Sequence, residues 1–82
     1  MIKVKSIGYQ QDNIQATVEY DLNKETHSFT VYAKLIQVYG MSSDEIKEYI
    51  RGRVESERAS RLRELVTLKL DDLIDVDLEE QL

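Results

Sequence analysis

The stretch IQATVEYDL, residues 14–22, decides the fold, because apolar and polar side chains alternate along its whole length. A period of two places successive side chains on opposite faces of a strand, and one apolar face is typical of a half-buried antiparallel strand. The same alternation occurs before and after this stretch. Before it, the phase slips near residues 6–8, which indicates a β-bulge.

Two polar segments, residues 11–13 and 23–24, separate the alternating runs and have the composition of turns. The third run alternates from His27 to Leu35, and Gly40 is expected to end it. We therefore predict an α+β fold that begins with a three-stranded antiparallel β-meander over about 2–10, 13–22 and 26–38.

A helix is expected to begin at Ser43. Ser42 and Glu45 have the spacing of a capping box, in which each side chain bonds the backbone amide of the other residue. Met41 and Ile46 occupy the two positions of a hydrophobic staple around this cap. The helical region should then extend over about 43–74. Its C-terminal part folds back on the sheet if the helix breaks near Gly52, and projects from the sheet if the helix is continuous.

The apolar residues of this helical region fall on two nearly opposite faces at about 100° per residue. The first face carries Ile46, Tyr49, Ile50 and Val54, and the second carries Leu62, Leu65, Val66, Leu70, Leu73 and Val76. One straight helix cannot bury both faces on a small sheet. Either the helix breaks near Gly52 and folds back, or its second half projects and packs on another chain. We favour projection, because the sequence has no proline and no later glycine to form a turn.

The second face is the predicted interface between copies of the chain, formed by Leu62, Leu65, Val66, Leu70 and Leu73. Tyr32 is added to this interface because it lies in the outward phase of its strand, and an outward tyrosine can anchor a contact. The expected result is a homo-oligomer.

The net charge of −5 is concentrated at the C-terminal end of the chain. Residues 71–82 form an acidic segment that suits a basic protein surface and repels nucleic-acid phosphate. The residues of this predicted acidic partner surface are Asp71, Asp72, Asp75, Asp77, Glu79 and Glu80.

The sequence carries no catalytic, cofactor-binding or metal-binding constellation that we can identify. It has no cysteine, its one histidine, His27, lies in phase with an apolar strand face, and its three glycines are isolated. Five arginines, Arg51, Arg53, Arg58, Arg61 and Arg63, form one basic concentration. Glutamates are interleaved with them, so the pattern favours ion pairs within the helix, such as Glu57 with Arg61, over nucleic-acid contacts.

These observations predict one domain over residues 1–82, with a meander at 1–39, a helical segment at 42–76 and the acidic end. We expect a non-enzymatic protein-interaction or assembly module that self-associates through its C-terminal helix. One alternative is a small acidic inhibitor or adaptor that binds a basic protein surface, for example a nucleic-acid-binding one. The other is a weak nucleic-acid binder that uses residues 51–63. No cofactor, small-molecule substrate or membrane partner is expected, and the absence of cysteine and of a signal-peptide block favours the cytoplasm.

Overall fold

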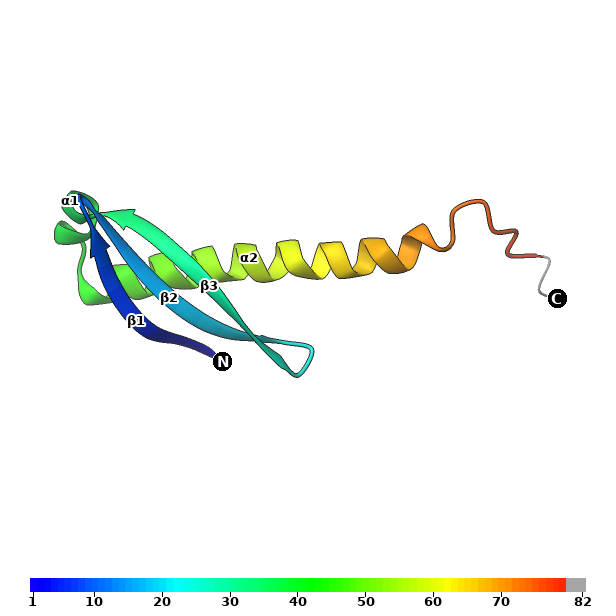
Figure 1. The fold of residues 1–82 in the computed structure, drawn as a ribbon, viewed down its shortest axis with the longest axis horizontal. Coiled ribbons are helices and arrows are strands. Elements are labelled where there is room, and N and C mark those ends of the chain that lie inside the picture. Colours follow the sequence, from blue (N-terminus) through cyan, green and yellow to red (C-terminus); the bar gives the residue numbers. More distant parts are fainter. Residues whose placement is uncertain (80–82) are drawn as a thin grey trace.

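The computed structural model describes residues 1–79 of the chain. It contains strands β1 (Ile2–Gln10), β2 (Asn13–Leu22) and β3 (Glu25–Lys34), a short helix α1 (Leu35–Tyr39) and a long helix α2 (Ser43–Asp71). The strands form one antiparallel sheet in the order β1-β2-β3, and α2 runs across one face of it (Figure 1). The predicted α+β fold, a three-stranded meander followed by a helix, is confirmed.

The sheet register explains why the alternating pattern of β2 produces the core. Val18 lies opposite Val4 on one side and opposite Phe29 on the other, so the three side chains share one face of the sheet. The pairing shifts between Val4 and Ser6, and this bulge keeps Ile7 on the same face as Val4. The bulge accounts for the phase slip in the sequence, and it lies slightly earlier than predicted.

The two strand connections are tight turns that need left-handed backbone conformations. Asn23 and Lys24 have φ angles of 53° and 69°, as expected for the two central residues of a hairpin turn whose twist matches that of the strands. Gln11 has a φ of 54° in the first turn. Both predicted turns are therefore present.

The third strand is shorter than predicted, because it ends at Lys34 and not at residue 38. Lys34 pairs with Asn13, the first residue of β2, so the chain beyond it has no strand to pair with. The amide of Leu35 donates instead to the carbonyl of Asp12 over 2.8 Å, and α1 follows. The alternation of apolar and polar residues continues to Leu35, but β2 has no residue before Asn13 with which the chain beyond Lys34 could pair.

The start of α2 agrees with the prediction. The Ser42 hydroxyl accepts from the Glu45 amide at 3.2 Å, and the Glu45 carboxylate accepts from the Ser42 amide at 2.9 Å. These bonds, chiefly the one from the Ser42 amide, hold the pKa of Glu45 below its ordinary value. Gly40, which was expected to end the third strand, lies instead at the C-terminal end of α1.

The helix is continuous, so the alternative of a break near Gly52 is wrong. α2 extends without interruption through 29 residues, a length of about 43 Å at 1.5 Å per residue. An added Cβ at Gly52 would meet no atom within 4 Å, which shows that this position faces open space. The helix ends at Asp71, and the next residues, which we expected to be helical as far as 74, form turns.

The core is small and lies between the first half of α2 and the sheet. Its buried side chains are Ala16, Val18, Tyr20 and Val31 from the sheet, and Val54 from α2. The second half of α2 extends past the sheet and makes the molecule 61 Å long (Figure 1). The radius of gyration of 18.4 Å, against about 12 Å for a compact chain of this length, reflects the same extension. Within residues 1–79, no helix is both long and apolar enough to cross a membrane.

Candidate interaction surface

A polar cluster lies where α2 leaves the sheet. The side chain of Tyr20 is fully buried, and its hydroxyl donates to Glu57 Oε2 at 3.0 Å and accepts from Arg61 Nε at 2.9 Å. Arg61 and Glu57 also form the predicted i,i+4 ion pair, at 3.5 Å. The hydrogen bond to Tyr20 and the electrostatic interaction with the same residue raise the pKa of the Arg61 guanidinium, and the charge of Glu57 adds to this effect. From Leu62 to the end of the described chain, every residue is exposed.

Two further side chains enclose the ring of Tyr20. The guanidinium carbon of Arg58 lies 5.7 Å from the ring centre, and Arg58 Nη1 contacts Glu55 at 3.1 Å. His27 on β3 stacks against the same ring with 5.6 Å between ring centroids, and its Nε2 lies 3.7 Å from Glu25. These contacts support the interpretation of His27 as a packing residue at the edge of the apolar face.

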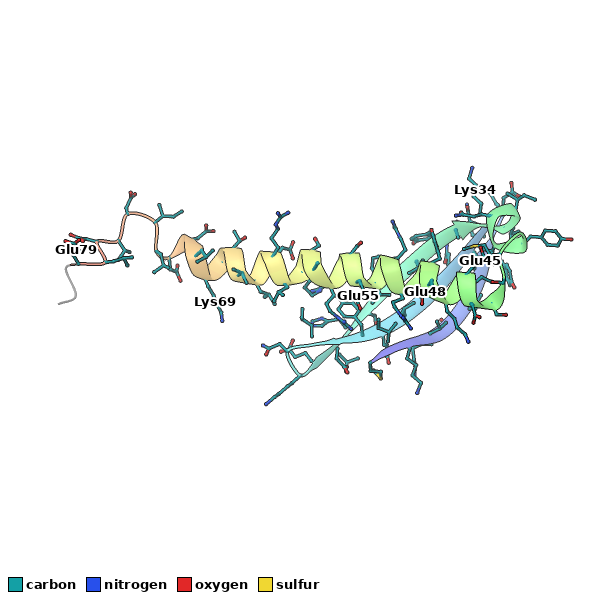
Figure 2. All side chains as sticks on the ribbon, turned by 180° about the vertical axis from the view of Figure 1, so that it is seen from behind. Lys34, Glu45, Glu48, Glu55, Lys69 and Glu79 are labelled. Carbon is teal, nitrogen blue, oxygen red and sulfur yellow. The ribbon has the colours of Figure 1, made fainter. Side chains whose placement is uncertain are left out.

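The predicted interface lies on the part of the chain that has left the sheet. We call Leu62, Leu65, Val66, Leu70 and Leu73 the projecting stripe; each is between 43% and 55% exposed. The first four lie on α2, and Leu73 lies in the turn that follows it. In Figure 2, Glu48 lies where the sheet accompanies α2, whereas Lys69 lies where no strand does.

The direction of the projecting stripe follows from helix geometry. At about 100° per residue, Leu65 lies roughly 20° from the buried Val54, and Leu62, Val66 and Leu70 lie roughly 80–160° from it on the same side. Ile46, Tyr49 and Ile50 lie roughly 40–140° from Val54 on the other side. The centres of the two apolar faces are therefore roughly 160° apart around the helix, which agrees with the nearly opposite faces expected from the sequence.

Tyr32 is not part of this surface. It is 55% exposed and pairs with Gln15, so it lies on the face of the sheet away from α2. The alternation of β3 correctly predicts that the side chain of Tyr32 points away from the core. The packing of α2 shows in addition that this side of the sheet is opposite to the projecting stripe. We remove Tyr32 from the candidate interface.

The predicted acidic surface is spread along the end of the chain. Asp71 is the last residue of α2 and Asp72 is its C-cap. Asp75 and Glu79 lie in the two turns that follow, and Asp77 lies between these turns. All five are exposed. Glu80 lies outside the described residues. These carboxylates and the projecting stripe therefore share the same end of the molecule (Figure 2 labels Glu79).

The arginines of α2 are engaged in ion pairs along the helix. Arg51 pairs with Glu48 at 3.1 Å, and Arg58 and Arg61 form the pairs described above. Three of the five arginines therefore already have a carboxylate neighbour on their own helix, which agrees with the predicted intrahelical interpretation.

A second apolar surface, which the sequence reasoning missed, lies on β1. Val4, Ile7 and Tyr9 pair with Val18, Ala16 and Ile14, so they face the same side of the sheet as the core. They are nevertheless 43%, 59% and 73% exposed, because α2 packs over β2 and β3. We call these three residues the β1 row. The sequence could have indicated this surface, because it predicts one helix and three strands. A helix about 10 Å across cannot cover the whole width of three strands that lie about 4.8 Å apart.

The β1 row continues into an apolar groove beside the first turns of α2. The groove has a volume of about 250 Å³, and Ile7 and Tyr9 form one wall while Ile46, Tyr49 and Ile50 form the other. The hydroxyl of Tyr49 donates to the carbonyl of Tyr32 at 3.1 Å, which fixes that side of α2 to β3. The lining is suited to apolar side chains and offers little chemistry for a polar ligand.

Within residues 1–79, no group of three or more His, Cys, Asp or Glu side chains is arranged to hold a metal ion. Comparison of the chain with protein-family models finds no match, and comparison with curated proteins and with solved structures finds none either.

Proposed function

We propose that this chain is a non-enzymatic assembly module that self-associates through the projecting stripe. The observation that carries the proposal is that four apolar side chains on the part of α2 that has left the sheet, and a fifth in the turn after it, are each about half exposed. Contiguous apolar surface of this extent is typical of protein–protein contact sites.

The length of the unsupported helix supports the same proposal. After Arg61, its last contact with the sheet, α2 continues for ten residues to Asp71. Most of the stability of a helix in a protein comes from tertiary packing of its apolar face, and every residue of this segment is exposed. Packing of the projecting stripe against a partner would supply the tertiary contacts that stabilise helices in folded proteins.

The test is the molar mass in solution, measured by light scattering after size exclusion and by sedimentation from low to high micromolar concentration. The unmodified chain should be a dimer or higher oligomer. The double substitution Leu65→Glu with Leu73→Glu should give a monomer with an unchanged sheet signal in circular dichroism. A chain that is already a monomer at high micromolar concentration would overturn the proposal.

A matched control carries the same added charge on the other side of the helix. Ser60 and Thr67 lie about 120–140° from the centre of the projecting stripe at 100° per residue, and both are exposed. Ser60→Glu with Thr67→Glu should therefore keep the oligomer. Loss of the oligomer in both double variants would attribute the effect to charge and not to the stripe.

A second candidate function is binding of a basic protein surface by the acidic end. The observation that favours it is that Asp71 and Asp72 stand at the C-terminal end of α2, where the helix dipole disfavours negative charge. A basic partner would relieve this repulsion. Binding to immobilised polylysine should then fall when both aspartates are changed to asparagine. Salt-sensitive retention on heparin would instead support a weak nucleic-acid binder that uses the arginines of α2.

A further inference from the structure

The chain has two exposed apolar surfaces that complement each other. The projecting stripe is part of a helix without a sheet, and the β1 row is part of a sheet without a covering helix. Their lengths are similar: Leu62 to Asp71, where α2 ends, spans about 14 Å along the helix, and Val4 to Tyr9 spans about 16 Å along a strand. Within one copy they cannot meet, because α2 is continuous and carries the stripe away from the sheet (Figure 1).

The direction of the elements determines how a second copy would fit. β1 points toward the end of the sheet where α2 begins, so β1 and α2 run in opposite directions (Figure 1). In a dimer with a two-fold axis perpendicular to the helices, the partner's α2 runs opposite to α2 and therefore along β1 in the same direction.

The point at which α2 leaves the sheet gives the register. Arg61 makes the last contact, with Tyr20, and Tyr20 lies opposite Ile2 at the start of β1. By symmetry, the partner's helix reaches this sheet beside Ile2 with the residue that follows its own Arg61. Leu62 then lies near Ile2, and the residues about Leu70 lie near Ile7. The two-fold axis therefore passes close to the point where each α2 leaves its own sheet and reaches the sheet of the other copy.

We propose that the self-association is a reciprocal exchange, in which the projecting stripe of each copy covers the β1 row of the other and the two α2 helices are antiparallel. This inference rests on the proposed function and names the surface that receives the stripe. Aliphatic side chains are smaller than the aromatic ones, which bury about 150–250 Å² each, so complete burial of the exposed parts of the stripe and the β1 row would bury roughly 700 Å² per chain. This is close to the roughly 800 Å² that each partner contributes to an interface of standard size.

The test uses cysteine cross-linking, which suits this chain because it contains no cysteine of its own. Ile7→Cys and Leu70→Cys are made singly, mixed at micromolar concentration, and oxidised mildly with oxidised glutathione. Disulfide-linked dimers are then counted on a non-reducing gel. In the control, Ser6→Cys replaces Ile7→Cys, because Ser6 pairs with Thr17 and lies on the other face of the same strand.

The mixture of Ile7→Cys and Leu70→Cys should cross-link roughly 100-fold faster than the mixture with Ser6→Cys, because the docked thiols have about millimolar effective concentration. Equal rates in the two mixtures, with an oligomeric unmodified chain, would overturn the reciprocal exchange and leave the proposed function standing. Fast linkage of Leu70→Cys to itself would also overturn it, because the exchange places the two copies of Leu70 on opposite sides of the two-fold axis, roughly 25 Å apart along the helices. A monomeric unmodified chain would overturn both proposals. Circular dichroism of each single variant establishes that it is folded before oxidation.

Discussion

Replacing Val54 with alanine should lower the free energy of unfolding by about 2–3 kcal/mol. Val54 is fully buried and packs on Val18, Tyr20 and Val31 in the core cluster, so it attaches α2 to the sheet. The loss of two buried methyl groups costs about 0.8 kcal/mol each. A cavity of roughly 50 Å³ at about 24 cal/mol per Å³ adds about 1 kcal/mol. A domain of this size has a net stability of only about 4–12 kcal/mol, so the loss should be conspicuous.

The measurement is urea unfolding followed by circular dichroism and by tyrosine fluorescence, since Tyr20 reports on the same core. The midpoint should fall by roughly 1–2 M urea at an unchanged slope. Val66→Ala is the matched control, because it removes the same atoms from a half-exposed position on the same helix. At concentrations low enough for the monomer, Val66→Ala should cost less than about 0.5 kcal/mol. Equal losses for the two variants under these conditions would refute the docking of α2 through Val54.

Three further predictions concern the start and the interior of α2. Ser42→Ala should cost about 1 kcal/mol, because the Glu45 amide loses its capping acceptor, and an unchanged urea midpoint would place the start of the helix elsewhere. Folding lowers the pKa of Glu45, so the ionised carboxylate stabilises the folded state at every pH above the pKa of an unfolded glutamate. This stabilisation is lost as the pH falls through the lower pKa of the folded state. Glu45→Gln should therefore weaken the dependence of the unfolding free energy on pH in the acid range. Gly52→Ala should stabilise the protein by about 0.5–1 kcal/mol, because the added methyl group enters open space in a helix interior, and destabilisation would indicate that the helix bends there.

The sequence by itself determined the elements whose signals are local. The alternation of residues 14–22 predicts which side chains of β2 are buried, because a strand turns successive side chains to opposite faces whatever lies around it. Ser42 and Glu45 locate the start of α2 for the same reason, since a capping box is complete within four residues. The ion pair of Glu57 with Arg61 also follows from spacing along one helix.

The tertiary structure decided the features that depend on what lies beside a segment. β3 ends at Lys34 because β2 begins at its partner Asn13, although the apolar alternation continues to Leu35. The continuity of α2 past Gly52 exposes the projecting stripe, and the position of α2 over β2 and β3 leaves the β1 row uncovered. A period in the sequence states which face of an element is apolar, but not which neighbour covers that face. The covering is set by the width of the sheet and the path of the helix, and these exist only once the chain has folded.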